Sequence, residues 1–456
     1  MIKRHIKATL KPKNKIKVNH IYLARFKRFF ESVMTKLAIV GSGIGGCASA
    51  YFAHKYLPDT KITIYDAQQQ TGGRILTHKA YNTNLELGAA FFNGANRTIL
   101  ELVNELKLDF QQVEEYRDFM IWDGAKTVFR SNKNGLLNNL KIFSKYHSSV
   151  LKVLHLLTEA KKQLAEFYLQ AQKGPAEIGS LFESTGLNKY YSKPFDAILT
   201  EAGVNQAFID EAVSPITRTI YSQNADLSGF AGLASLIGVY GHPIYRFTEG
   251  NNTFPVRLVE ASNAKVKQNQ KITNIERTAE GSYRLSSETD SEIFDNIIIA
   301  TPFELADIEF DEIKIPIWKP QQYQTMFTKV KLGIFNPTYF GVNNATDAPA
   351  IVLTTKKADP ITHYSIHKTQ NDQSIVTLTS TEPISDDLFD EILSKSTPVL
   401  EHSWKATYPK FKPILKLPPT QLDNGLFYVN AVEPAVSSME TSALSALNCV
   451  KMISKQ

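Results

Sequence analysis

Four glycines within six residues carry the most specific chemistry in this sequence: Gly41, Gly43, Gly45 and Gly46. They follow an apolar run, residues 37–40, that fits a short buried strand, and they precede residues with helical spacing. In such a unit Gly41 permits the tight turn out of the strand, and Gly43 lets backbone N–H groups approach a pyrophosphate. Gly46 lets the helix pack closely on the sheet. The pattern therefore predicts a dinucleotide-binding loop.

An aspartate lies where such a loop needs an acidic partner. Residues 61–66 alternate as a second strand that ends at Asp66, twenty residues after Gly46. A carboxylate at this position accepts hydrogen bonds from ribose hydroxyls. The strand, glycine loop, helix, strand and acid together are far more specific than a glycine loop alone.

A second glycine pair narrows the choice of nucleotide. Gly72, Gly73 and Arg74 follow Asp66 within eight residues. This spacing resembles the flavin branch of dinucleotide folds, in which the glycine pair and the arginine lie along the diphosphate of FAD. The resemblance implies FAD as the cofactor, with Gly73 and Arg74 beside it, and leaves NAD as the minor alternative.

Two later segments support FAD. Residues 265–302 fit several strands and end at Thr301, resembling the flavoprotein pattern in which backbone near Ile272 meets the adenine. Near the C-terminus, a strand precedes a helix expected from about Ala435. The positive end of that helix, near Glu433 and Val436, would face the flavin ring where negative charge collects on reduction. Plain C-terminal packing is the alternative for this helix.

Over residues 36–456 the chain is similar to the prenylcysteine oxidases, also called prenylcysteine lyases, a branch of the FAD amine-oxidase-like flavoproteins. Three segments carry the resemblance: the glycine loop continued to "LELGAAFFNG", then "FIDEAVSPITRTIYSQNADLSGFAGLASL", and finally "LFYVNAVEPAVSSMETSALSALN". The resemblance implies that Gly88 also lies at the flavin.

The family chemistry implied by this resemblance is oxidative cleavage of a thioether. Hydride leaves the carbon beside sulfur, FAD accepts it, and water captures the resulting cation. The products are cysteine, an isoprenoid aldehyde and, after reoxidation by oxygen, hydrogen peroxide. Such chemistry needs mainly orientation and a dry site, which agrees with the absence of a recognisable nucleophile motif or catalytic triad.

The catalytic residues cannot be assigned from the sequence. Arg218, Tyr221 and Gln223 are candidates for a polar lining near substrate or flavin, with ordinary hydrogen bonding in a turn as the alternative. Glu440 is a further candidate, with a structural ion pair as the favoured alternative. No residues show metal-ligand spacing; Cys47 and Cys449 fit two small core residues of a reducing compartment.

Two departures from the family pattern affect the flavin loops. Ala89 follows Gly88 where the family tends to have a glycine pair, and "EGNN" at 249–252 replaces an expected Gly-Gly-Asn. Weaker or rearranged flavin binding is the expected consequence.

The predicted fold class is α/β: a Rossmann-type FAD-binding domain of the amine-oxidase or glutathione-reductase-like type, with an inserted substrate domain of helices and sheet. We assign the discontinuous FAD-binding domain to residues 34–96, 245–305 and 421–456. The substrate domain takes residues 97–244 and 306–420.

The first residues form a separate basic extension. Residues 1–35 contain ten Lys or Arg and a single Glu, whereas the whole chain has a net charge of +6. The basicity therefore belongs to this tail, and no nucleic-acid partner is expected. For residues 1–33 three interpretations stay open: a start placed too far upstream of Met34, a disordered or membrane-surface arm, and organelle targeting. Without a recognisable signal peptide, we expect a cytoplasmic location, with peripheral membrane contact left open.

Three functions compete. The leading one is an FAD-dependent thioether oxidase that acts on a small apolar thioether such as prenylcysteine, with oxygen as electron acceptor. An amine oxidase or isoprenoid desaturase shares the hydride transfer to flavin. The third is a non-catalytic fold that binds a lipid or a protein partner.

Overall fold

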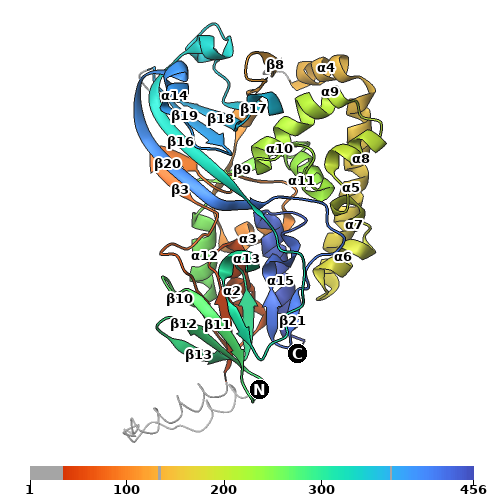
Figure 1. Cartoon of the computed structure of the whole chain (residues 1–456), viewed down its shortest axis with the longest axis vertical. Helices are drawn as coiled ribbons and strands as arrows, with labels where there is room; N and C mark the ends of the chain where they lie inside the picture. Colours follow the sequence, from red (N-terminus) through yellow and green to blue (C-terminus); the bar gives the residue numbers. More distant parts are fainter. Residues whose placement is uncertain (1–33, 132–134, 370–371, 456) are drawn as a thin grey trace, which may run out of the picture.

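The computed structural model describes residues 34–131, 135–369 and 372–455, so the predicted basic extension lies outside the described residues. Figure 1 shows two lobes stacked along the long axis of the molecule. The lower lobe contains both the earliest described strand and the C-terminal helix, and the upper lobe carries the longest strands. The predicted α/β class, with one nucleotide-binding lobe and one mixed lobe, is confirmed.

The lower lobe is built on a six-stranded sheet with the order β10-β2-β1-β14-β22-β21, in which all neighbours are parallel except β22 and β21. Its strands are β1 (Thr35–Val40), β2 (Thr60–Tyr65), β10 (Lys265–Lys267), β14 (Asn296–Ile299), β21 (Gln421–Asp423) and β22 (Leu426–Tyr428). All six lie in the three segments assigned above to the FAD-binding domain.

Alternating side chains of the parallel strands are buried on both faces of this sheet. Leu37 and Ile39 of β1 belong to the core that contains helices α2 (Ile44–Tyr56), α12 (Thr253–Ser262) and α15 (Met439–Ile453). Ala38 and Val40 belong to the core on the opposite face. That face is covered by a four-stranded sheet: β13 (Ser291–Phe294), β12 (Tyr283–Ser287), β11 (Ile272–Arg277) and β15 (Glu309–Asp311).

The upper lobe contains a seven-stranded sheet with the order β20-β16-β19-β18-β17-β7-β8. Its strands are β7 (Phe119–Trp122), β8 (Thr127–Arg130), β16 (Tyr323–Phe335), β17 (Ile351–Thr354), β18 (Ile361–Lys368), β19 (Ser374–Ser380) and β20 (Leu393–Pro409). Tyr364 and Ile366 of β18 pack in a core that includes Phe389 of α14 (Asp386–Ile392). The opposite face of the sheet is directed to a helical block.

The helical block follows β8 in the sequence and forms part of the predicted inserted domain of helices and sheet. It comprises α4 (Gly135–Tyr146), α5 (Ser148–Lys173), α6 (Ile178–Ser184), α7 (Asn188–Tyr191), α8 (Phe195–Glu201), α9 (Gln206–Phe208), a π-helical turn (Ile209–Val213), α10 (Ser214–Tyr221) and α11 (Gly229–Val239). The remaining short elements are α13 (Phe303–Ala306), the hairpin β3 (Thr77–Ala80) and β4 (Thr83–Glu86), and the small sheet of β5 (Phe92–Asn93), β9 (Ile244–Phe247) and β6 (Phe110–Gln112).

Helix α3 (Arg97–Leu106) differs from its predicted domain. It lies in the segment assigned to the substrate domain, yet Ile99, Leu102 and Val103 are buried in the core of the nucleotide-binding lobe. The reason is its apolar face, which packs against α15 and α12. The first lobe therefore extends beyond residue 96.

Candidate active site

The glycine loop between β1 and α2 leaves no room for side chains. Gly41 has φ +105°, and an added Cβ there would lie 2.9 Å from the carbonyl oxygen of Ala300. At Gly46 an added Cβ would lie 1.9 Å from the carbonyl oxygen of Gly41. Gly43 is the N-cap of α2 and gives it no side-chain cap, so the N–H groups of the first turn are available to a phosphate. Gly45 packs against Val429 instead.

Asp66 directly follows β2 and is only 9% exposed. Its Oδ2 accepts hydrogen bonds from the backbone N of Ser42 at 2.6 Å and from the Ser42 hydroxyl at 2.5 Å. Its Oδ1 accepts from the backbone N of Gln68 at 2.7 Å. The predicted acidic partner thus lies against the glycine loop, at the carboxyl end of its strand, where dinucleotide ligands bind.

Ile272 and Thr301 lie at the same edge of the nucleotide-binding lobe. The backbone N of Gln270 donates to the carbonyl of Asp66 at 2.8 Å, two residues before Ile272 begins β11. Thr301 follows β14, and its backbone N lies 3.4 Å from the position of an added Cβ on Gly41. The structure therefore brings the predicted adenine end and the predicted loop together.

The second glycine pair lies directly against the first loop. The backbone N of Gly72 donates to the carbonyl of Ser42 at 2.9 Å, and an added Cβ on Gly73 would lie 3.0 Å from the Cα of Gly43. The next residue, Arg74, forms an ion pair with buried Glu433 at 2.5 Å. Arg74 and Glu433 were each predicted to lie at the cofactor, and the structure shows that they pair with each other.

Ala89 and Asn251, the two residues that depart from the family pattern, contact each other beside Gly88. An added Cβ on Gly88 would lie 2.0 Å from the carbonyl oxygen of Arg74, so this position needs glycine. The carbonyl of the next residue, Ala89, accepts from Nδ2 of fully buried Asn251 at 2.8 Å. The backbone N of Asn251 donates to Oε1 of Glu86 at 3.0 Å. The altered loops therefore form one hydrogen-bonded unit.

These residues fit FAD. The glycine contacts leave space only for backbone beside a phosphate, a helix N-terminus follows the loop, and a buried carboxylate ends the second strand. Helix α15 begins at Met439, not near Ala435 as predicted, because Ser438 caps it by accepting from the backbone N of Thr441 at 3.1 Å. Val436 therefore lies in the loop before the helix.

A cavity of about 710 Å³ begins at these flavin-side residues and continues between the helical block and the seven-stranded sheet. Gly88, Ala89 and Val436 to Thr441 line one end. Most of the remaining lining side chains are apolar; they include Ile142, Tyr146, Val150, Phe208, Ile216, Phe230, Leu233, Ile351 and Leu353. Such a cavity suits a long apolar ligand.

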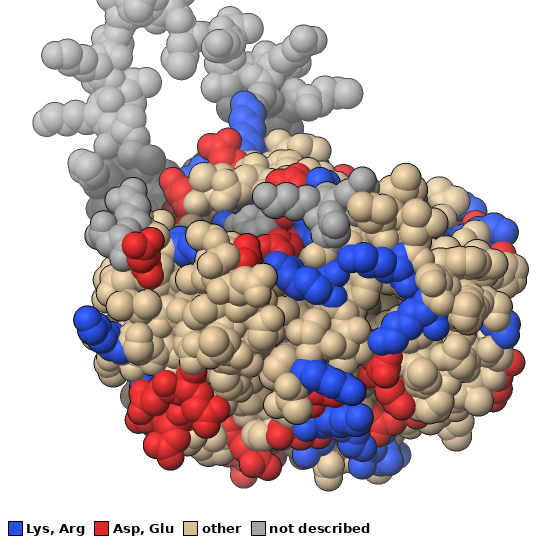
Figure 2. All heavy atoms as spheres, turned by 90° about the horizontal axis from the view of Figure 1, so that it is seen from above, with Lys and Arg blue, Asp and Glu red and all other residues tan. Residues whose placement is uncertain are grey.

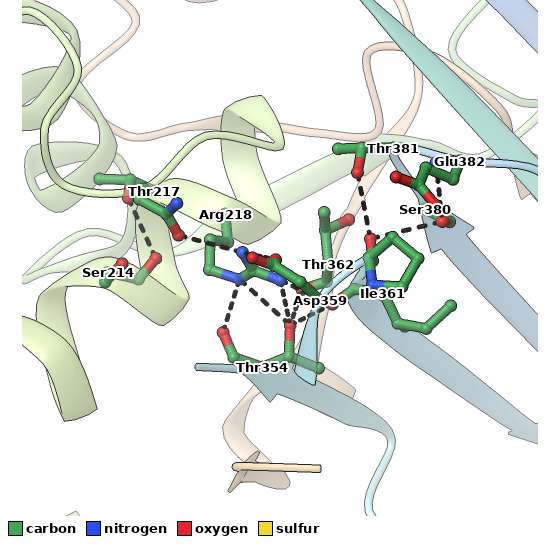
Figure 3. Close-up of polar contacts among 12 residues, drawn as sticks. Ser214, Thr217, Arg218, Thr354, Asp359, Ile361, Thr362, Ser380, Thr381 and Glu382 are labelled. Carbon is green, nitrogen blue, oxygen red and sulfur yellow. Dashed lines mark hydrogen bonds and ion pairs between the residues drawn. The ribbon is translucent and has the colours of Figure 1, made fainter. Parts of the chain in front are cut away.

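Arg218 is directed away from the cavity lining. It is 2% exposed and ties α10 to the turn between β17 and β18 (Figure 3). Its guanidinium donates to the carbonyls of Thr354 at 3.0 Å and Ile361 at 2.8 Å, and it pairs with Asp359 at 2.5 Å. Of the two interpretations of Arg218, a polar lining of the site or hydrogen bonding within the fold, the structure favours the second.

Tyr221 and Gln223 follow Arg218 but differ in position. Tyr221 lines the cavity, and its hydroxyl donates to the carbonyl of Ser437 at 3.3 Å. The Gln223 amide instead binds the segment at the end of β20: its Nε2 donates to the carbonyl of Pro409, and its Oε1 accepts from the backbone N of Phe411, both at 2.9 Å. Only Tyr221 of this pair lies where a substrate would bind.

Glu440 lies in the first turn of α15 and is buried. It accepts from the backbone N of Thr98 at 2.9 Å and of Ile99 at 3.0 Å, which are first-turn donors of α3. It also accepts from the hydroxyl of Tyr168 at 2.8 Å. Burial raises the pKa of this carboxyl. Its contacts are those of a helix cap between elements, although it also lines the cavity.

Sequence reasoning missed the cavity residues of the seven-stranded sheet. His363, Ser365, Thr377 and Thr379 line the cavity from β18 and β19. The two-residue period in "THYSIHK" and "SIVTLTS" predicts that these side chains share one face of a sheet. It does not predict whether that face packs in a core or lines a cavity. Among the described residues, no group of three or more His, Cys, Asp or Glu is arranged to hold a metal ion.

Replacing Asp66 by Asn should weaken FAD binding about tenfold to hundredfold, because a buried charged acceptor of two donors from Ser42 is lost. The dissociation constant can be measured from the fluorescence of released flavin. The same change at exposed Asp59, Asp59→Asn, is the matched control and should leave the constant unchanged. Equal FAD affinity in both variants would contradict the assigned role of Asp66.

Replacing Arg218 by Met should lower the free energy of unfolding by about 1–3 kcal/mol for each buried carbonyl left unpaired. Urea unfolding measures this. Asp359→Asn should cost less, because the Asp359 side chain is half exposed and the bonds from Arg218 to the carbonyls remain. An Arg218→Met protein of unchanged stability that no longer reduces its flavin would instead mark Arg218 as catalytic.

Comparison with known proteins agrees with this geometry. Residues 129–456 match the family described as prenylcysteine lyase, and residues 39–106 match an NAD(P)-binding Rossmann-like domain. The farnesylcysteine lyase of Arabidopsis thaliana is 29% identical over 91% of this chain and 87% of its own length. The prenylcysteine oxidase 1-like protein of Mus musculus is 28% identical over 91% of this chain and 89% of its own.

Solved structures share the fold at low sequence identity. A putrescine oxidase double mutant has a TM-score of 0.63 at 13% identity, covering 93% of this chain and 99% of its own. Cyclohexylamine oxidase from Brevibacterium oxydans has a TM-score of 0.60 at 14% identity, covering 92% and 99%. These likenesses establish the fold alone. Because the prenylcysteine lyase match extends over more than half of the sequence, the chain belongs to the prenylcysteine lyase family.

Proposed function

We propose that this protein is an FAD-dependent oxidase that cleaves the thioether of a prenylated cysteine to cysteine, an isoprenoid aldehyde and hydrogen peroxide. One observation carries the proposal: in a chain of this family, a largely apolar cavity of about 710 Å³ begins at the residues placed for the flavin. The names of the relatives, farnesylcysteine lyase and prenylcysteine oxidase, support the same substrate class.

When bound, FAD supplies the hydride acceptor for the carbon beside sulfur. The chain's own contribution is to orient and to dry the substrate. Ile216, Phe230 and Leu233 of the helical block and Leu353 of the sheet form apolar walls that exclude water from an isoprenoid chain. The N-terminus of α15 reaches the flavin end of the cavity, where its dipole favours negative charge on a bound group.

Water must still reach the oxidised carbon, because the aldehyde oxygen comes from it. With FAD bound, oxygen would be the final acceptor of the two electrons taken from the substrate carbon and would leave as hydrogen peroxide. We include oxygen in the proposal on the strength of the oxidase names among the relatives. An amine oxidase or isoprenoid desaturase remains the enzymatic alternative, and a non-catalytic lipid- or partner-binding protein the third; family membership favours neither.

We also propose a cytoplasmic location with peripheral membrane contact. Residues 1–33, for which a membrane-surface arm is one of three interpretations, lie outside the described residues, and an apolar surface on α4 supports membrane contact. Leu136 is 69% and Leu140 58% exposed, while Ile142 and Tyr146 of the same helix line the cavity. Helix α4 lies at the top in Figure 1, and Figure 2 shows uncharged side chains over much of that face.

Within the described residues, no helix combines the length and the apolar content needed to cross a bilayer. The exposed leucines of α4 place the proposed contact at the membrane surface, with Ile142 and Tyr146 of the same helix beside the cavity.

Anaerobic addition of farnesylcysteine should bleach the visible flavin bands of the purified protein, because hydride transfer reduces the cofactor without reoxidation. Absorbance spectroscopy measures this, and admitting air should restore the bands with one hydrogen peroxide per aldehyde. A primary amine of equal chain length is the control substrate and should leave the bands unchanged. Bleaching by the amine alone would move the assignment to amine oxidation, and a folded protein that takes up no FAD would exclude the enzyme.

The double substitution Leu136→Ser and Leu140→Ser should lower the fraction of full-length protein that floats with vesicles containing phosphatidylserine, because two exposed apolar groups are lost. Leu415→Ser is the matched control, since Leu415 is 91% exposed and lies outside α4. Binding that depends only on residues 1–33, tested by their deletion, would assign the contact to the tail and reject it for α4.

A further inference from the structure

The sheet wall of the cavity changes from apolar to polar across its strands. Strands β7 and β17 present Phe119, Ile121, Ile351 and Leu353 to the cavity. Besides Met326 of β16 and His367 of β18, the next strands present hydroxyl and imidazole groups: His363 and Ser365 from β18, Thr377 and Thr379 from β19, and Thr328 from β16. We call these last five residues the polar strip.

Strand register places the polar strip in line with the apolar residues. One row across the sheet pairs Ile121 with Leu353, Leu353 with His363, His363 with Thr379, and Thr379 with Thr328. The neighbouring row pairs Phe119 with Ile351, Ile351 with Ser365, and Ser365 with Thr377. In both rows the side chains change from apolar on β17 to polar on β18. The cavity therefore has an apolar and a polar side that face the same ligand.

The polar strip carries hydrogen-bonding capacity without formal charge. The Thr379 hydroxyl lies 3.2 Å from Nε2 of His363, and the hydroxyl of Thr362 lies 3.4 Å from its Nδ1. Burial lowers the pKa of His363 to about 4, so the ring is neutral at neutral pH and offers one donor and one acceptor. Hydroxyl groups likewise donate and accept. Such a surface can satisfy both an ammonium and a carboxylate.

The polar strip also lies toward the flavin end of the cavity. Next to Thr328 on β16, Met326 pairs with Trp404 of β20. The indole N–H of Trp404 donates to the carbonyl of Leu87 at 2.6 Å, one residue before Gly88. The helical block, which supplies most of the apolar wall, lies on the other side of the cavity. A ligand with one apolar and one polar end can therefore place its polar end against the polar strip, although charged residues also line the cavity: Glu86, Arg97, Lys161, Arg246 and Glu440.

We infer that the polar strip is the subsite for the amino-acid end of the thioether substrate, while the isoprenoid lies against β7, β17 and the helical block. The inference rests on the proposed function. A free cysteine end carries an ammonium and a carboxylate. Burying these charges without hydrogen bonds is strongly unfavourable in free energy, and contact with an apolar wall does not compensate for it. Thr328, Ser365, Thr377 and Thr379 provide the hydroxyls, and neutral His363 orients that of Thr379. The sulfur then lies between the two ends, next to the flavin side.

The test compares two thioethers that differ only at the polar end: farnesylcysteine, and farnesyl methyl sulfide, which has no amino-acid group. Thr379→Val keeps the shape of the side chain and removes its hydroxyl. It should raise the Kd of farnesylcysteine about tenfold to hundredfold, because a hydrogen bond to a charged group is lost. The Kd of farnesyl methyl sulfide should stay within about twofold of the native value, because that ligand makes no such bond. Anaerobic flavin reduction at varied substrate concentration gives both constants.

Two further variants sharpen the comparison. Ser365→Ala, in the second row, should discriminate between the substrates in the same direction and covers the case that Thr379→Val fails to fold. Leu353→Ala is the matched control at the apolar end of the row of His363, and it should weaken both substrates alike. Flavin content and the unfolding midpoint are measured for each variant.

Equal weakening of both substrates by Thr379→Val and Ser365→Ala, in a native protein that both substrates reduce, would overturn the assignment of the polar strip and leave the proposed function intact. A native protein that neither substrate reduces would overturn the proposed function and the strip together. If Leu353→Ala weakened farnesylcysteine more than farnesyl methyl sulfide, and the strip variants did not, the amino-acid end would instead lie beside Leu353.

Discussion

An ion pair between partly buried Arg74 and buried Glu433 links segments of this chain that are far apart in the sequence. Arg74 comes from the first part of the nucleotide-binding lobe and Glu433 from the last, more than three hundred residues later. Arg74 also donates to the carbonyl of Thr407 on β20 of the upper lobe, and Glu433 accepts from the hydroxyl of Tyr323 on β16. Removing the Arg74 charge would leave the Glu433 carboxylate buried without this partner, which is strongly unfavourable. The flavin end of the cavity therefore depends on a contact that involves both lobes.

Part of the nucleotide site could be predicted from the sequence because it depends on backbone conformation and on contacts between residues close together in the chain. Gly46 and Asp66 act through partners within a few dozen residues, and Gly41 is favoured by its own positive φ of +105°. The roles of Arg218 and Glu440 depend on groups far away in the sequence, the carbonyl of Thr354 and the backbone of Thr98. A single sequence shows the residue type at such positions but not the partner.

The cavity wall illustrates an intermediate case. The alternation in β18 and β19 predicts two faces, yet only the tertiary arrangement shows that His363 and Thr379 meet a cavity while Tyr364 and Leu378 meet a core. The altered flavin loops are similar. Ala89 and Asn251 look like two independent departures in the sequence, and the structure shows a direct hydrogen bond between them. The acceptor of this bond is the backbone of Ala89, so the bond explains the side chain of Asn251 and the position of the Ala89 carbonyl.

The two faces of the seven-stranded sheet also separate two kinds of evolutionary change. Successive residues of β18 alternate between the cavity and the core beneath α14, so a substitution at His363 or Ser365 leaves the packing of Tyr364 and Ile366 untouched. Substrate preference can then drift along one face while selection for folding acts on the other. Changes on the cavity face of β18 therefore alter which polar group a ligand meets there while the core beneath α14 keeps its residues.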